Sequence, residues 1–142
     1  MWHIIRTVVL GATLGLVGCN HAVSPLRNIT VTVSVSSSVI RANETTQITT
    51  TLQNTGLEDA YVPSTSCGPL HAIMNEHGEY LPLGPELCTL ELPAPLRLAP
   101  GDRVQFTASW DGRDRCGTRT PGDYRITAGT FGGNAVVVRV LD

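Results

Sequence analysis

Strict alternation of apolar and polar residues is the feature of this 142-residue sequence that most limits its fold. In residues 28–36, every second residue is β-branched and apolar: Ile29, Val31, Val33 and Val35. Residues 103–110 repeat the pattern, with Val104, Phe106, Ala108 and Trp110 on the apolar side. A period of two residues is typical of a β-strand with one buried face. No useful run with a helical period follows residue 19, so the sequence predicts an all-β domain.

The other strand candidates are short, and turn residues separate them. They are residues 46–53, 70–74, 88–92, 96–98, 124–128 and 134–141, and the clearest turns are Asn54-Thr55-Gly56, His77-Gly78 and Pro100-Gly101. Pro93 and Pro95 interrupt the central stretch, which therefore suits a sheet edge or a crossover. We predict an antiparallel β-sandwich of about seven strands that occupies residues 28–142.

Composition excludes two broad classes of protein. The apolar content of 42% is too high for a disordered chain. Ten basic residues, all Arg, stand against 12 acidic ones, and the net charge is −2. Without an excess of positive charge, nucleic acid is not expected as a partner.

The N-terminal region, residues 1–19, has the form of a secretory signal. The uncharged run of residues 7–17 is too short for a permanent membrane helix, but it fits the apolar core of a signal peptide. The run ends in Leu16-Val17-Gly18-Cys19, which resembles a bacterial lipobox. We therefore expect Cys19 to be lipidated, and residues 20–27 to form a short linker. This predicts a lipid-anchored protein of the bacterial cell envelope, exposed to the periplasm or the exterior.

Three further cysteines follow the proposed lipidation site, and exported proteins keep disulfides. If the chain turns back near His77-Gly78, Cys67 and Cys88 fall opposite each other. We favour this disulfide, which would stabilise the fold by about 3 kcal/mol in the entropic model. A bridge between Cys88 and Cys116 is the alternative. In the favoured pairing, Cys116 is left as a single thiol in a polar turn.

Two metal sites can be written from the sequence, and we expect neither. Cys67, His71, His77 and Cys88 could supply four zinc ligands, but their spacing matches no known zinc finger. A calcium site could use Asp111, Asp114 and Asp123. Arg113, Arg115 and Arg119 lie among these acids and can neutralise them locally. The sequence contains neither G-x-S-x-G nor H-E-x-x-H, so we predict no enzyme, no metal and no cofactor.

The second half of the chain contains a sequence pattern that resembles a known protein family. Its residues are Leu98-Ala99-Pro100-Gly101-Asp102, Phe106, Trp110-Asp111-Gly112-Arg113-Asp114, Gly117 and Pro121-Gly122-Asp123-Tyr124. This pattern resembles the BsuPI-like intracellular proteinase inhibitor family, and it is similar to the Ig-like domain of the flagellar hook-assembly scaffold protein. The resemblance implies an Ig-like sandwich in which Tyr124 forms a tyrosine corner. It carries across no inhibitory residue.

These features support three functions for a lipid-anchored domain. The first is binding to another envelope protein through loops or a sheet edge. The second is inhibition of a proteinase, for which residues 63–90 are the most constrained long loop. The third is a structural role as a spacer at the membrane surface.

Overall fold

The computed structural model describes residues 26–63, 71–81 and 94–142. Within these residues the protein is all-β, as predicted, and apart from the strands it has one 3-10 turn, η1 (Gly129–Phe131). The strands are β1 (Ile29–Val35), β2 (Val39–Ile40), β3 (Thr46–Asn54), β4 (Ala60–Val62), β5 (Ala72–Met74), β6 (Leu96–Leu98), β7 (Arg103–Trp110), β8 (Gly122–Thr127) and β9 (Val136–Val140). The alternating segments correspond to β1, β3, β7, β8 and β9. The short strands β2 and β4 were not predicted, and residues 88–92 lie outside the described part.

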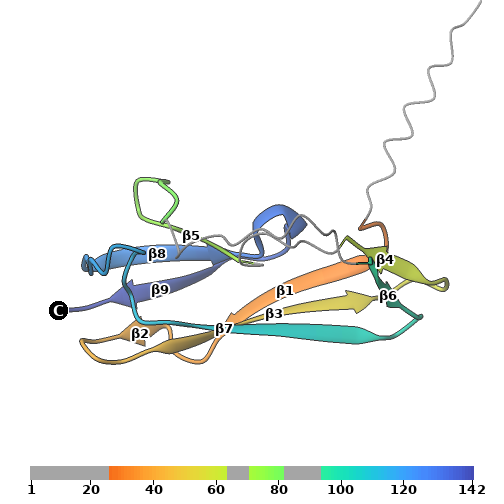
Figure 1. The fold of residues 1–142 in the computed structure, drawn as a ribbon, viewed down its shortest axis with the longest axis horizontal. Coiled ribbons are helices and arrows are strands. Elements are labelled where there is room, and N and C mark those ends of the chain that lie inside the picture. Colours follow the sequence, from red (N-terminus) through yellow and green to blue (C-terminus); the bar gives the residue numbers. More distant parts are fainter. Residues whose placement is uncertain (1–25, 64–70, 82–93) are drawn as a thin grey trace, which may run out of the picture.

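The strands form two main sheets, and these make the two layers of a sandwich (Figure 1). One sheet has the order β1-β3-β7, and the other has the order β2-β9-β8-β5. A small third sheet pairs β4 with β6. Neighbours are antiparallel except β2 and β9, which run parallel with Val39 opposite Arg139. The Ig-like β-sandwich is therefore confirmed, with one parallel pair at its edge.

The core lies between the two layers and is made by the predicted apolar faces. Val31 and Val33 are buried on β1, and Ile126 and Val138 are buried on the opposite sheet. The inward residues of β7 are half-buried except Trp110, which is 5% exposed. The ring centroids of Trp110 and Tyr124 lie 5.1 Å apart in an edge-to-face arrangement. Such a pair adds about 1 kcal/mol beyond the burial of its area.

The chain enters the sandwich at one end, which the buried Asn54 holds together. Its side-chain amide donates to the carbonyl oxygens of Glu58, at 2.7 Å, and Leu98, at 2.9 Å. The backbone N–H of Asn54 donates to Asp102, at 2.9 Å. Thr55 also donates its backbone N–H to the carbonyl oxygen of Asn28, at 2.8 Å. The turns before β4 and β7 are thereby fixed to the first described residues.

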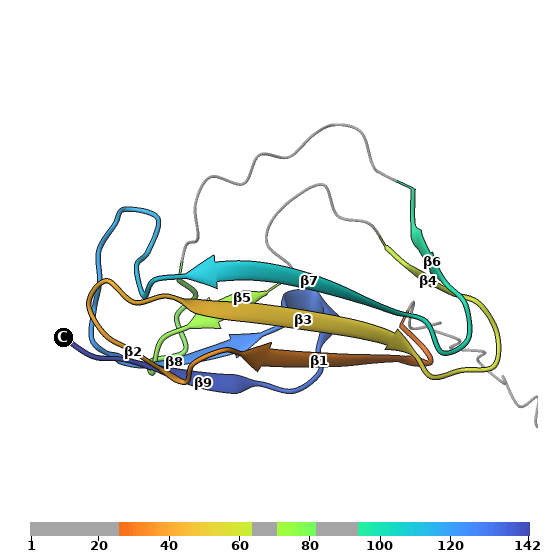
Figure 2. The same cartoon turned by 90° about the horizontal axis from the view of Figure 1, so that it is seen from below.

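The side chain of Asn134 links the two layers, because it bonds to the backbone of β1 as a neighbouring strand would. The side-chain amide of Asn134, just before β9, accepts from the backbone N–H of Val33 at 2.7 Å. It also donates to the carbonyl oxygen of Val33 at 2.9 Å. Figure 2 shows β1 at the edge of its sheet, beside β9.

Candidate interaction site at the far end of the sandwich

The end of the sandwich opposite the start of β1 carries the C-terminus and the connection from β7 to β8 (Figures 1 and 2). These two strands lie in different sheets, and a bridge between Arg113 and Arg119 makes the connection a small hairpin, the β7–β8 hairpin. The turn that follows β5 lies toward this same end. The hairpin runs between two strands of the core, and the turn after β5 is closed by a bridge between Met74 and Tyr80, so the sandwich sets the positions of both. These two turns form the candidate site.

The tip of the β7–β8 hairpin is a tight turn over Asp114–Thr118. The carbonyl oxygen of Asp114 accepts from the N–H of Gly117 at 3.0 Å, and the N–H of Asp114 donates to Thr118 at 2.9 Å. The Oδ1 atom of Asp114 accepts from the N–H groups of Cys116 and Thr118, at 2.9 and 2.8 Å. Gly117 has a φ of 81°, which glycine adopts without strain. This hydrogen bonding fixes the backbone and leaves the side chains of Arg115 and Cys116 exposed.

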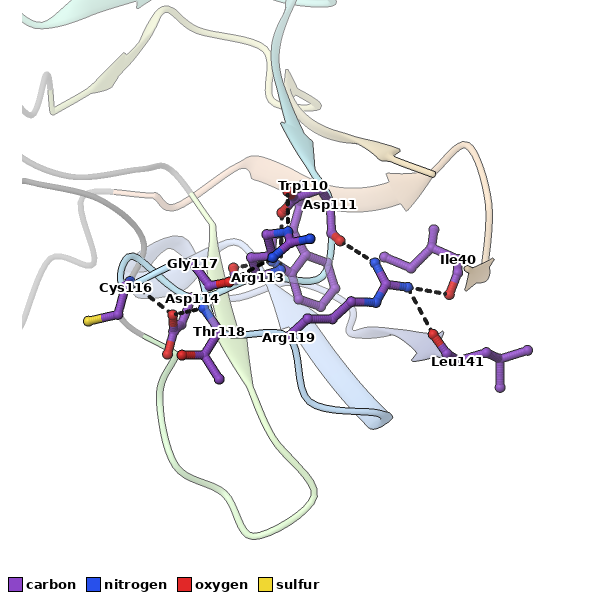
Figure 3. Close-up of polar contacts among 10 residues, drawn as sticks. All are labelled: Ile40, Trp110, Asp111, Arg113, Asp114, Cys116, Gly117, Thr118, Arg119 and Leu141. Carbon is purple, nitrogen blue, oxygen red and sulfur yellow. Dashed lines mark hydrogen bonds and ion pairs between the residues drawn. The ribbon is translucent and has the colours of Figure 1, made fainter. Parts of the chain in front are cut away.

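The root of this hairpin is held by two side chains (Figure 3). The indole Nε1 of Trp110 donates to the carbonyl oxygen of Arg113 at 3.0 Å. The guanidinium of Arg119 donates to three carbonyl oxygens, those of Asp111 at 2.7 Å, Ile40 at 3.1 Å and Leu141 at 3.0 Å. Arg119 thus ties the hairpin to β2 and to the residue that follows β9.

Gly112 allows this root to close. It has a φ of 82° and is buried. A Cβ atom at this position would lie 3.2 Å from side-chain carbons of Ile40 and Val140, and 3.3 Å from a guanidinium nitrogen of Arg119. Both the backbone conformation and the space therefore require glycine.

Tyr124 forms the predicted tyrosine corner at the base of the site. Its hydroxyl donates to the carbonyl oxygen of Thr120 at 2.7 Å. Burial raises the pKa of this phenol, so the hydroxyl keeps its proton and remains a donor across the neutral range.

The second turn, Asn75–Glu79, has the same hydrogen-bond pattern as the first. The carbonyl oxygen of Asn75 accepts from Gly78 at 3.0 Å, and its N–H donates to Glu79 at 2.9 Å. Its side-chain oxygen accepts from the N–H groups of His77 and Glu79, at 3.0 and 2.9 Å. Gly78 has a φ of 79°. The turn near His77-Gly78 is thereby confirmed, and it exposes Glu76 and His77.

A groove separates the second turn from β8. One hollow of about 140 Å³ is lined by the turn on one side and by residues 120–124 on the other. A wider, more open hollow of about 330 Å³ continues over Met74, Arg125 and Val137. Asp123 lies in both hollows and pairs with Arg139 through two contacts, at 2.7 and 2.9 Å. These hydrogen bonds lower the pKa of Asp123, so the pair is charged at neutral pH.

The three acids that could have formed a calcium site do not converge in the structure. Asp111 lies 3.3 Å from the Nε of Arg113, Asp114 caps its own turn, and Asp123 pairs with Arg139. Within the described residues, no group of three or more His, Cys, Asp or Glu side chains could hold a metal ion. Of the three arginines expected to neutralise these acids, Arg113 does so, whereas Arg119 binds carbonyl oxygens instead.

Several predicted site residues lie outside the described part of the chain. These are the lipobox residues Leu16, Val17, Gly18 and Cys19, and the proposed disulfide partners Cys67 and Cys88. Cys116 is exposed and forms no disulfide with a described residue. His71 and His77 lie at opposite ends of β5, and burial lowers the pKa of His71. In the described ranges, no helix is long and apolar enough to span a membrane.

Sequence reasoning missed Arg119 as the residue that joins the hairpin to the sandwich. Its partners are backbone carbonyls, and one of them is 79 positions away in the chain. No residue type or spacing signals such contacts. The role of Asp114 was also missed, although the run Asp-x-x-Gly is a known turn signal.

Comparison with known proteins bears on the fold alone. No protein-family model matches this sequence, and no curated protein matches it. The chain is similar in structure to the Pseudomonas fluorescens alkylpurine DNA glycosylase AlkC, with a TM-score of 0.53 and 14% identity. That likeness covers 81% of this chain and 31% of the glycosylase chain, so this protein spans about a third of it.

A β-glucosidase from Erythrobacter marinus gives a TM-score of 0.49 at 14% identity, over 80% of this chain and 15% of the enzyme. A CARDB domain from Pyrococcus furiosus gives a TM-score of 0.45 at 18% identity, over 80% of this chain and 87% of that one. At these levels of similarity, neither protein informs the function of this chain.

Proposed function

We propose that this protein is a non-enzymatic, lipid-anchored envelope protein that binds another protein through its Ig-like domain. The lipobox-like run that ends at Cys19 supports the anchor. The observation that carries the proposal is the placement of two exposed turns with fixed backbones at the end opposite Leu26. If the chain is anchored through Cys19, this end faces away from the membrane.

The two turns suit protein binding because their backbones are ordered before a partner arrives. Each turn has two hydrogen bonds between backbone groups and two from backbone N–H groups to an Asp or Asn side chain. In the second turn, Asn75 also donates to the carboxylate of Glu79, at 2.8 Å. Ordering a loop on binding costs free energy, so a loop that is already ordered binds more tightly. Arg115 and Glu76 add opposite charges at the two tips, which favour partner specificity.

Site-specific photo-crosslinking in cells of the source bacterium tests the proposal. A photoreactive residue would replace Arg115 or His77 in the full-length protein, and Thr107 on the outer face of β7 would be the matched control. We expect crosslinks from positions 115 and 77 to one defined protein, and none from position 107. The charge reversal Arg115→Glu should weaken that crosslink from position 77, whereas Arg103→Glu near the opposite end should not.

Two results would contradict the proposal. Equal crosslinking from all three positions would show contact without a specific face. Absence of any protein crosslink from positions 115 and 77 would favour the spacer role instead.

Proteinase inhibition is the second candidate, and the BsuPI-like resemblance motivates it. The exposed Arg115, on a turn with a fixed backbone, is the observation that favours it, because a rigid exposed loop is what a protease cleft accepts. Most of residues 63–90, the loop that the sequence favours for this role, lies outside the described part of the chain.

Titration of the purified full-length protein against serine proteases that cleave after Arg separates the two candidates. Inhibition requires stoichiometric loss of protease activity, with the domain left uncleaved. Arg115→Ala should then abolish the inhibition and Arg103→Ala should leave it unchanged. No loss of activity at about 50 μM, some fifty times a micromolar Kd, would rule inhibition out for those proteases.

A further inference from the structure

Two large side chains with apolar surface are exposed on the segment that follows β3, at the end of the sandwich where the chain enters. Leu57 is 95% exposed and Tyr61 is 56% exposed. Leu57 lies on the turn between β3 and β4, and Tyr61 lies on β4. We call these two residues the proximal patch.

The proximal patch lies at the same end of the molecule as the first described residues. The turn that carries Leu57 is bonded to Asn28 through the backbone N–H of Thr55, at 2.8 Å. The hydroxyl of Thr55 donates to the same carbonyl oxygen at 3.1 Å. Figures 1 and 2 both show this turn and the β4–β6 pair at that end, opposite the C-terminus.

The covalent distance to the proposed anchor is short. Leu26 lies seven positions after Cys19, and a fully extended chain of that length spans about 25 Å. A lipid on Cys19 therefore keeps this end of the domain within reach of the bilayer surface, where exposed leucine and tyrosine side chains are favoured.

The charges beside the patch are balanced. Arg27 and Glu58 are exposed nearby, and Asp59 pairs with Arg97 through contacts of 2.6 and 2.7 Å. Arg97 is also the cross-strand neighbour of Tyr61. Because no net positive charge accompanies the apolar residues, contact with lipid should depend on apolar insertion and not on anionic headgroups.

We propose that the proximal patch docks onto the lipid surface that holds Cys19, with Leu57 inserted among the acyl chains and Tyr61 at the headgroup level. This inference rests on the lipid anchor of the proposed function. Tyrosine suits the boundary between lipid and water because its ring is apolar and its hydroxyl is polar. Docking would fix the orientation of the domain, so that the β7–β8 hairpin points away from the membrane.

Tryptophan fluorescence tests the docking directly. If the signal peptide is removed, Trp110 is the one remaining tryptophan, and it is buried in the core. Lipidated protein without the signal peptide and carrying Leu57→Trp would be reconstituted in phosphatidylcholine vesicles with and without brominated acyl chains. Arg115→Trp at the far end is the matched control, and the wild type gives the background from Trp110.

We expect brominated lipid to lower the emission of the Leu57→Trp protein about twofold, and to leave the Arg115→Trp protein at the background level. The quenching should persist with added phosphatidylglycerol and at high salt, because insertion is apolar. Leu57 is almost fully exposed, so its replacement should leave the thermal unfolding temperature unchanged.

Vesicle flotation of the wild type and of Cys19→Ser separates the two proposals. Flotation of the wild type alone, without quenching at position 57, would overturn docking and leave the anchor in place. Equal quenching at positions 57 and 115 would also overturn docking, since the domain would then have no fixed orientation. Failure of the wild type to float would overturn both proposals.

Discussion

The turns Asn75–Glu79 and Asp114–Thr118 share one pattern of backbone hydrogen bonds but differ in how they are attached to the domain. The first continues from the three-residue strand β5, and it is joined to the sheet mainly through β8. The second rises from a root that Gly112, Trp110 and Arg119 tie to β2 and β9. A turn of this kind can thus be formed by a few local residues, whereas its placement depends on contacts distant in sequence.

The largest effect should come from Gly112→Ala, which disrupts the packing at the root of the β7–β8 hairpin. A φ of 82° is costly for alanine, and its Cβ would crowd Ile40 and Val140. We expect the free energy of unfolding to fall by about 2–4 kcal/mol. Chemical denaturation would measure this, with Gly117→Ala and Gly78→Ala as controls. Those glycines have a similar φ but open space around them, so each should cost about 1 kcal/mol.

Arg119→Met should have the next largest effect, because it removes a donor from three carbonyl oxygens. We expect a loss of about 2–3 kcal/mol, measured by denaturant unfolding. Arg113→Met is the control, since Arg113 is exposed and its guanidinium bonds only within the hairpin. Equal losses for the two variants would show that the root is not the stronger attachment.

Removal of the capping side chain from each tip should give smaller and similar effects. Asp114→Ala and Asn75→Ala each delete an acceptor for two backbone N–H groups. We expect each to lower the free energy of unfolding by about 1 kcal/mol. Asp114→Asn retains the acceptor and should restore most of the loss. If Asp114→Ala lowered the free energy of unfolding several times more than Asn75→Ala, the two tips would not be equivalent.

The smallest effect concerns Asp123 in the groove between the turns. The pair with Arg139 lowers the pKa of Asp123, so its contribution is present above the unfolded pKa, near 4. It is lost as the pH falls through the lower folded pKa. Asp123→Asn should therefore make the free energy of unfolding depend slightly less on pH in this acidic range. At neutral pH, the profile of the variant should run parallel to that of the wild type. Thermal unfolding at a series of pH values would measure the difference.

The sandwich could be predicted because its long strands show a clear alternation of apolar and polar residues in the sequence. Residues 28–36 and 103–110 alternate strictly, and each became a strand with its apolar side toward the core. Strands β2 and β4 span two and three residues, which is too short for alternation to be recognised. β2 adds to the edge of the longer strand β9, whereas β4 pairs with β6, which also spans three residues.

The candidate site was less predictable than the fold. The turn at His77-Gly78 was anticipated from its glycine, and the tyrosine corner at Tyr124 followed from the resemblance. The contacts of Arg119 and Asn54 could not be anticipated, because both side chains bond to backbone groups that the fold alone brings near.

The contact between Asn134 and Val33 also bears on whether a further strand can add to β1. An edge strand with free N–H and C=O groups is a template on which other chains can add strands and aggregate. Asn134 occupies both backbone groups of Val33 at the middle of β1, and Gly133 lies so close that a Cβ there would be 2.5 Å from the carbonyl oxygen of Val31. If the proposed anchor concentrates copies of the protein on one surface, β1 therefore offers them no free backbone groups at Val33 for a further strand.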